Sequence, residues 1–135
     1  MPWDFNDLDS RFHPEVVAVV GSRRADDYVW LRNMADFKGK LYSVQVDASD
    51  IEGIEKMGIS NYKSLAEIPE SVDYVVIAVP RHVAPAILKD AIDKGVKAVH
   101  MFTSGFAEAG NPEGTQLQQQ VTDMARETGL LLLGP

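Results

Sequence analysis

The sequence of 135 residues contains no cysteine, which excludes disulfide bonds and metal sites built on thiolates. It has no apolar run near the ~20 residues of a membrane-spanning helix, so no segment is predicted to cross a bilayer. The first residues, Met1 to Asp7, carry acids where a secretory signal peptide has lysines and an apolar core. These absences favour a reducing compartment, and we expect a cytoplasmic protein.

Positive charge is also scarce, with 13 lysines and arginines against 20 acids and a net charge of −7. This balance argues against a general nucleic-acid surface, but it is compatible with a local basic pocket for a phosphorylated ligand. The three histidines, His13, His82 and His100, are scattered, and none has a partner at metal-ligand spacing. We therefore expect no metal site and no nucleic-acid partner.

The chain does contain apolar strand-like runs that alternate with helix-like runs, a pattern typical of a parallel sheet covered on both faces. We expect an α/β fold of about five strands, with helices on both faces, in one domain over residues 1–135. The predicted strands are Val16–Val20, Leu41–Val46, Tyr74–Val79, Ala98–Phe102 and Leu130–Leu133, and a shorter strand is compatible with Ile59–Tyr62.

Helical spacing and stop signals place the helices between these strands. The predicted helices are Asp27–Phe37, a short turn from Ser64 to Ile68, Val83–Lys94, Thr115–Thr128, and a short helix within the first dozen residues. The last predicted strand runs directly into Gly134-Pro135. We therefore expect the chain to be a fragment of a longer protein.

The most informative local feature is the turn Gly21-Ser22-Arg23-Arg24, which follows the first predicted strand. Backbone N–H groups of a small-residue turn, together with a helix N-terminus, form a common anion-binding arrangement. Two guanidinium groups in that turn suit a ligand with more than one phosphate. Ligands of open parallel sheets bind beyond the carboxyl ends of the strands, which is where this turn is predicted to lie.

Three other strand ends carry candidate residues: Gln45-Val46-Asp47, Val79-Pro80-Arg81-His82 and Thr103–Glu108. Purely structural interpretations remain open, because the arginines of the first turn could pair with nearby acids and Pro80 could simply end a strand. The small-residue loop over 103–113 is long for this fold, which favours a functional role.

A dinucleotide-binding fingerprint is the obvious rival interpretation of the first turn. It fails on the second and third glycines, because Arg23 and Asp26 occupy those positions. Asp47, however, lies near the end of the second strand, where an NAD site places an acid on the ribose. An NAD(H)-binding sensor or oxidoreductase domain therefore stays open as an alternative.

Several motifs occur in a fixed order over about residues 12–135: Val17–Ser22, Phe37–Tyr42, Tyr62–Pro69, Val72–Pro80, Lys94–Ala98, Thr103–Glu108, Ala125–Gly129 and a final Gly134-Pro135. Together they resemble the CoA-binding domain of NDP-forming (ADP-forming) acyl-CoA synthetases, and more distantly the alpha subunit of succinyl-CoA synthetase. No single motif is specific, whereas their order is.

The resemblance implies a Rossmann-like domain that binds coenzyme A or an acyl-CoA. In that family the turn after the first strand contacts the CoA phosphates, the Val-Pro strand end lies against the nucleotide, and the loop after the fourth main strand lines the pantetheine path. The cofactor-binding residues predicted here are Gly21, Ser22, Arg23, Arg24, Val46, Asp47, Val79, Pro80, Phe102, Thr103, Ser104 and Gly105.

The resemblance also implies that the chemistry lies in neighbouring domains, since these synthetases use a phosphohistidine in a second domain and a nucleotide-grasp domain beyond it. No catalytic residue is therefore predicted in this chain. One departure is the second strand end, where the family usually has Asn-Pro, often followed by a lysine, and this chain has Gln45-Val46-Asp47. Because an acid repels a phosphate, either Asp47 points away, or affinity is weak, or the pocket has changed use.

Three functions stay open. The first is the CoA-binding module of an ADP-forming acyl-CoA synthetase, or of an acyltransferase that reuses this domain as a regulator. The second is the NAD(H)-binding domain described above. The third is an interaction domain whose pocket has decayed.

Overall fold

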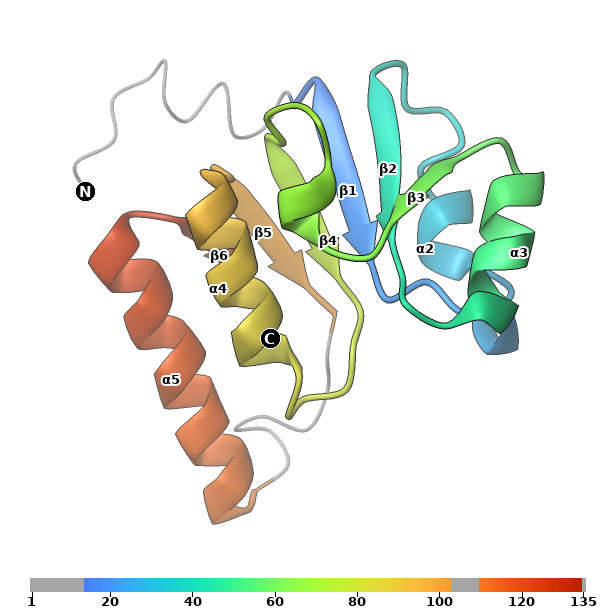
Figure 1. The fold of residues 1–135 in the computed structure, drawn as a ribbon. Helices are drawn as coiled ribbons and strands as arrows, with labels where there is room; N and C mark the ends of the chain where they lie inside the picture. Colours follow the sequence, from blue (N-terminus) through green and yellow to red (C-terminus); the bar gives the residue numbers. More distant parts are fainter. Residues whose placement is uncertain (1–13, 103–109, 135) are drawn as a thin grey trace.

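Six parallel strands form one sheet at the centre of the part of the chain that the computed structural model describes, residues 14–102 and 110–134 (Figure 1). The strand order is β3-β2-β1-β4-β5-β6, and every neighbouring pair is parallel. The strands are β1 (Val16–Val20), β2 (Lys40–Val44), β3 (Ser60–Tyr62), β4 (Tyr74–Ile77), β5 (Ala98–Met101) and β6 (Leu131–Leu133). The predicted parallel α/β fold is confirmed, with six strands rather than five.

The sixth strand is β3, which the sequence left as a shorter possibility. It has three residues and pairs with β2 from Tyr42↔Ser60 to Val44↔Tyr62. Its burial is only partial, because it lies at the edge of the sheet. This explains why its apolar signal is weaker than that of the central strand β1, all five residues of which are buried.

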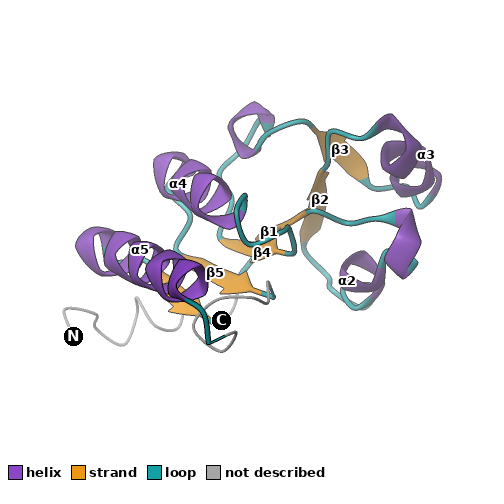
Figure 2. Ribbon diagram, turned by 90° about the horizontal axis from the view of Figure 1, so that it is seen from below, coloured by secondary structure: helices purple, strands orange, loops and turns teal. Residues whose placement is uncertain are grey.

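Helices cover both faces of the sheet, as expected (Figure 2). On one face lie α4 (Ala84–Lys94), α5 (Pro112–Thr128) and the short 3₁₀ turn η2 (Leu65–Glu67), packed on Ala18, Val20 and other residues of the larger core cluster. On the other face lie α2 (Val29–Arg32), α3 (Ala48–Lys56) and the 3₁₀ turn η1 (Arg24–Asp26). Their core cluster includes Val19, so successive residues of β1 face opposite helical layers.

The predicted helix over Asp27–Phe37 is wrong in its extent, because only Val29–Arg32 within it is α-helical. The chain forms η1 instead, then two residues in left-handed backbone, Asp27 (φ 57°) and Tyr28 (φ 54°), and then the four-residue α2. The left-handed turn directs Tyr28 into the core, where it is buried and its hydroxyl donates to the Asp50 carbonyl at 3.0 Å. Core burial of one aromatic ring therefore overrides the local helical pattern.

Helix α3 was missed by the sequence analysis. It begins at Ala48, directly after its N-cap Asp47, and it buries Ile54 against the sheet. Gly53 in its interior is a poor helix former, which hid the helical pattern. The structure gives the reason for this glycine, since a Cβ there would overlap the Tyr28 hydroxyl oxygen and lie 2.6 Å from Tyr28 Cζ.

Several predicted element ends are shifted by one to three residues. The second strand ends at Val44 rather than Val46, because the N–H groups of Val46 and Asp47 bond to the Gln45 side chain instead of a neighbouring strand. Strands β4 and β5 end at Ile77 and Met101, β6 begins at Leu131, and the helices begin at Ala84 and Pro112. The helix predicted within the first dozen residues lies outside the described residues.

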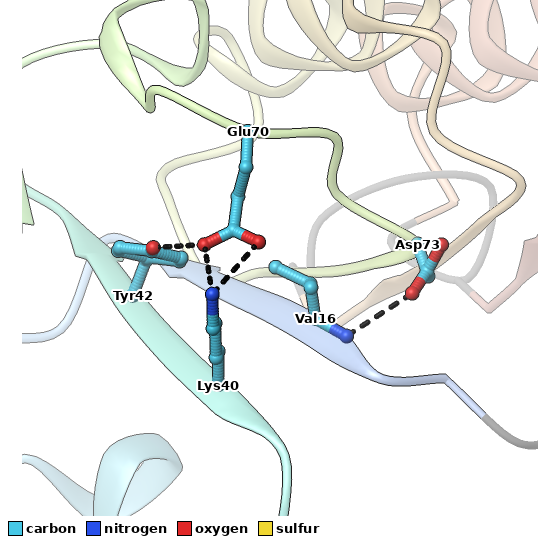
Figure 3. A network of polar contacts seen from close by, with 5 residues as sticks. All are labelled: Val16, Lys40, Tyr42, Glu70 and Asp73. Carbon is cyan, nitrogen blue, oxygen red and sulfur yellow. Dashed lines mark hydrogen bonds and ion pairs between the residues drawn. The ribbon is translucent and has the colours of Figure 1, made fainter.

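A polar network closes the amino edge of the sheet, opposite the predicted site (Figure 3). Glu70 accepts hydrogen bonds from the Tyr42 hydroxyl and from Lys40 Nζ, the latter at 3.2 Å. Asp73 accepts from the Val16 N–H at 3.1 Å and thereby fixes the start of β1. The carboxylate of Glu70 raises the pKa of Tyr42 to about 12, and the hydrogen bond from Tyr42 lowers the pKa of Glu70.

No helix within residues 14–102 and 110–134 is long and apolar enough to cross a membrane.

Candidate functional site

A cavity of about 240 Å³ opens at the carboxyl ends of β1, β4 and β5. The chain leaves β1 toward β2 on one side, whereas β4 lies on the other side, so this is the point where the strand order reverses. The lining residues are Arg23, Asp26, Trp30, Ala78, Val79, Pro80, Arg81 and Phe102. The cavity thus lies where open parallel sheets bind their ligands.

Gly21 forms the narrow passage between the β1 turn and the end of β4. Its φ is +97°, and a Cβ there would overlap the Ala78 carbonyl oxygen and come within 2.8 Å of Val79 Cγ1. Backbone conformation and close approach both require glycine at this position. The next residue, Ser22, is fully buried, and its hydroxyl has no hydrogen-bond partner within the described part of the chain.

The two arginines of the first turn have different environments. Arg23 lines the cavity, and its Nε lies 3.9 Å from Asp26, an ion pair at the limit of contact. Arg24 is not among the lining residues, and its backbone N–H donates to the Asp50 carboxylate at 2.9 Å. Asp27, the acid that follows Asp26 in the chain, pairs with Arg32 at 3.2 Å. Arg23 is therefore the arginine of this turn that faces the cavity.

A second arginine, Arg81, lines the cavity from the turn after β4. Arg81 is 27% exposed, and its Nη2 lies 3.1 Å from the carboxylate of Glu113 in the first turn of α5. Arg23 and Arg81 therefore supply positive charge from two separate strand ends.

Aromatic rings form one wall of the site. Trp30 of α2 stacks on Phe102 with ring centroids 4.0 Å apart and planes inclined by 22°. The imidazole ring of His100 in β5 packs on the same Phe102 ring, with the two ring centroids 3.9 Å apart. Burial lowers the pKa of His100. Phe102 itself remains 41% exposed. The wall thus leaves part of an aromatic ring accessible beside the two arginines.

The end of β2 is built differently from the other strand ends. The Asp47 carboxylate accepts from the Ser49 N–H at 2.9 Å and from the Ser49 hydroxyl at 2.7 Å, and these bonds lower the pKa of Asp47. It serves as the N-cap of α3 and does not line the cavity. Gln45 Nε2 donates to the Ser22 carbonyl at 2.7 Å and ties this strand end to the β1 turn.

The structure therefore brings together only some of the predicted site residues. Arg23, Val79, Pro80 and Phe102 line the cavity, and Gly21 and Ser22 form the turn beside it. Arg24, Val46 and Asp47 are not lining residues, and the Val46 side chain is 69% exposed. Thr103, Ser104 and Gly105 lie outside the described residues.

Four lining residues were absent from the predicted cofactor-binding residues: Asp26, Trp30, Ala78 and Arg81. Of these, Arg81 was named only as a candidate at its strand end. Arg81 had a usable signal, because it directly follows the Val-Pro end of a predicted strand. Trp30 had none, because its segment was assigned to a long helix that the structure does not contain. Nothing in the sequence linked that segment to the end of β5.

The family model described as "CoA binding domain" matches residues 15–135. The chain is 38% identical over 133 residues to the acetate–CoA ligase [ADP-forming] I subunit alpha of Pyrococcus furiosus, covering 95% of this chain and 28% of that subunit. It is 32% identical over 134 residues to the acetate–CoA ligase [ADP-forming] II of Archaeoglobus fulgidus, covering 96% of this chain and 19% of that enzyme.

Among solved structures, the chain is similar to the dinucleotide-forming acetyl-coenzyme A synthetase 1 of Ca. Korarchaeum cryptofilum in complex with phosphate and ADP. The TM-score is 0.82 at 32% identity, covering 97% of this chain and 28% of that chain. The present chain thus spans less than a third of the length of each of these three proteins.

Proposed function

Because this chain belongs to the CoA-binding domain family, we propose that it binds coenzyme A or an acyl-CoA in the cavity at the carboxyl edge of its sheet. The observation that supports this most strongly is the pair Arg23 and Arg81, which line one cavity at the point of strand-order reversal. Guanidinium groups match phosphate oxygens in charge and geometry, and CoA carries a diphosphate and a 3′-phosphate. The chain's net charge of −7 opposes a general attraction of anions, so these two local guanidinium groups have to supply the attraction for the phosphates.

The proposed arrangement assigns the turn after β1 to a phosphate and the end of β4 to the nucleotide. Arg23 is the residue of the β1 turn that reaches the cavity, and we assign it to the 3′-phosphate. Val79 and Pro80 form an apolar contact, and the exposed part of Phe102 is available to a flat or apolar group. Loss of one charge-assisted contact is worth about 1.5–3 kcal/mol, or about ten- to hundredfold in affinity.

Calorimetric titration with CoA, dephospho-CoA and NADH tests the proposal. We expect CoA to bind more tightly than dephospho-CoA, and Arg23→Gln to remove that preference. Arg24→Gln is the matched control, because it changes the same charge one residue away without altering a lining side chain. Absence of CoA binding, or binding of NADH alone, would refute the proposed ligand.

No observation favours the NAD(H) alternative. The acid that kept it open, Asp47, is engaged by both donors of Ser49 as a helix cap. A dinucleotide site also lacks its second and third glycines here, as Arg23 and Asp26 stand in their place.

At the level of the whole protein, we propose that this domain works within an ADP-forming acyl-CoA synthetase or a related acyltransferase. The support is the identity to acetate–CoA ligases, whose lengths exceed the matched region more than threefold. Neighbouring domains would then supply the chemistry and the acyl substrate site. Incubation of the 135-residue chain alone with acetate, ATP and CoA should yield no acetyl-CoA by chromatography, and its formation would refute this division of roles.

A further inference from the structure

We propose that Arg81 binds the diphosphate of the ligand, and that Glu113 competes with the diphosphate for the Arg81 guanidinium. This inference rests on the proposed CoA function and extends it to an exchange of ion-pair partners within the site. Arg81 would pair with a carboxylate in the empty domain and with phosphate oxygens in the complex.

The position of Arg81 assigns it to the middle of the ligand. It follows Pro80, whose carbonyl accepts the Val83 and Ala84 N–H groups at 2.9 and 3.2 Å where α4 begins. This fixed turn holds Arg81 at the carboxyl end of β4, adjacent in the sheet to the end of β1. In parallel sheets with this strand order, the diphosphate of a nucleotide ligand lies by the turn after the first strand, in the crevice where the strand order reverses. Arg81 lines the same cavity as Arg23 of that turn.

The partners of Arg81 differ in how firmly they are held. The Asn111 Oδ1 accepts the Gly114 N–H at 2.7 Å as the N-cap of α5, and its contact with Arg81 Nη1 is long at 3.5 Å. The Glu113 carboxylate lies 3.1 Å from Arg81 Nη2, and its side chain is 64% exposed. Of these two partners Glu113 is the charged one, and its exposed side chain has room to turn toward solvent.

A diphosphate outcompetes this carboxylate for electrostatic and geometric reasons. It carries more negative charge than one carboxylate, and its oxygens accept two parallel N–H bonds from a guanidinium. Glu113 loses little on release, because an exposed acid in the first turn of a helix remains favourably placed near the helix N-terminus. Arg23 adds attraction for the ligand from the opposite strand end.

A purely structural role for the Arg81–Glu113 pair predicts a different result. If the pair only fastened α5 to the turn after β4, removal of either partner would destabilise the same link. Both substitutions would then change affinity in the same direction or leave it unchanged. The exchange predicts opposite signs, since loss of Arg81 removes a ligand contact and loss of Glu113 removes a competitor.

The experiment is titration of CoA and dephospho-CoA into the wild-type chain, Arg81→Gln and Glu113→Gln, with melting temperatures measured in parallel. We expect Arg81→Gln to weaken both ligands by about tenfold or more, since both contain the diphosphate. We expect Glu113→Gln to strengthen both by about two- to fivefold, the range of an exposed ion pair, with a slightly lower melting temperature. Arg126→Gln and Asp123→Asn, an exposed pair elsewhere on α5, are controls for net charge and should have no effect.

If Arg81→Gln and Glu113→Gln change the affinity for CoA in the same direction, or if neither changes it, the proposed exchange of ion-pair partners is overturned, while CoA binding itself stands. If Arg81→Gln loses affinity for CoA but not for dephospho-CoA, the assignment of Arg81 to the diphosphate is overturned. Absence of binding by the wild-type chain would instead refute the proposed function, and the inference with it. If Arg81→Gln does not fold, Glu113→Gln decides alone, because only competition predicts a gain in affinity.

Discussion

Substitution of Gly53 by alanine should destabilise the protein, although helix propensity predicts the opposite. Gly53 lies inside α3, where replacement of glycine by alanine ordinarily stabilises by about 1 kcal/mol. Here the added Cβ would overlap the Tyr28 hydroxyl oxygen and lie 2.6 and 2.8 Å from Cζ and Cε2 of the ring. Tyr28 cannot move aside freely, because it is buried and bonded to the Asp50 carbonyl.

The magnitude follows from these opposing effects. Overpacking in a core costs about 1–3 kcal/mol, and loss of the Tyr28 hydrogen bond costs about 1 kcal/mol more. After subtraction of the propensity gain, we expect a net loss of about 1–3 kcal/mol. For 135 residues the unfolding entropy is about 0.28 kcal/mol/K, so a loss of about 2 kcal/mol lowers the melting temperature by about 7 °C.

Urea denaturation of a double-mutant cycle measures this coupling directly. Tyr28→Leu removes the hydroxyl oxygen and the two ring carbons that the new Cβ would meet. In that background, Gly53→Ala should stabilise the protein by about 1 kcal/mol, as propensity alone predicts. A stabilising effect in the wild-type background, or a coupling energy near zero, would refute the explanation of this glycine.

Three further predictions concern other parts of the fold. Tyr42→Phe should lower the free energy of unfolding at neutral pH. Because the hydrogen bond from Tyr42 holds the pKa of folded Glu70 below its usual 4.5, the difference from wild type should start to shrink as the pH falls below about 4.5 and should be lost once the pH is below the lowered pKa of folded Glu70, as melts at a series of acid pH values would show. A difference that persists unchanged at lower pH would contradict this. Gly21→Ala should lower the free energy of unfolding by about 3 kcal/mol in urea and abolish CoA binding, since positive φ and close approach act together. Asp47→Ala should lower the melting temperature by removing the α3 cap, with CoA affinity unchanged; weaker CoA binding would show a ligand contact.

The sheet could be predicted because its evidence is local. A run such as Val16–Val20 is buried on both sides and reads as continuous apolar sequence, and Gly95 and Gly129 end α4 and α5 in left-handed backbone. The place of the site follows from the same information, since the strand ends of a parallel sheet meet at one edge.

The remaining features depend on contacts between distant segments. Tyr28 adopts a left-handed conformation because its ring is buried beneath α3, and Gly53 is required only because that ring is there. The neighbourhood of Trp30 and Phe102 likewise joins residues far apart in sequence. No periodicity within these segments carries that information, so the short α2 and the aromatic wall could not be predicted. Helix α3 does have local signals, its cap Asp47 and the spacing of Ile51 and Ile54, but Gly53 between them obscured the pattern.

The Tyr42–Glu70–Lys40 network and the cavity lie at opposite ends of the strands. The five residues of β1 span about 16 Å, roughly twice the distance over which exposed charges interact at physiological salt. Glu70 accepts its hydrogen bonds from Lys40 and Tyr42, and none of these three residues lines the cavity. The free energies of substitutions at the two ends should therefore add. A lineage or an engineer can therefore adjust the thermal tolerance of this domain at one edge of the sheet and its ligand affinity at the other as independent traits.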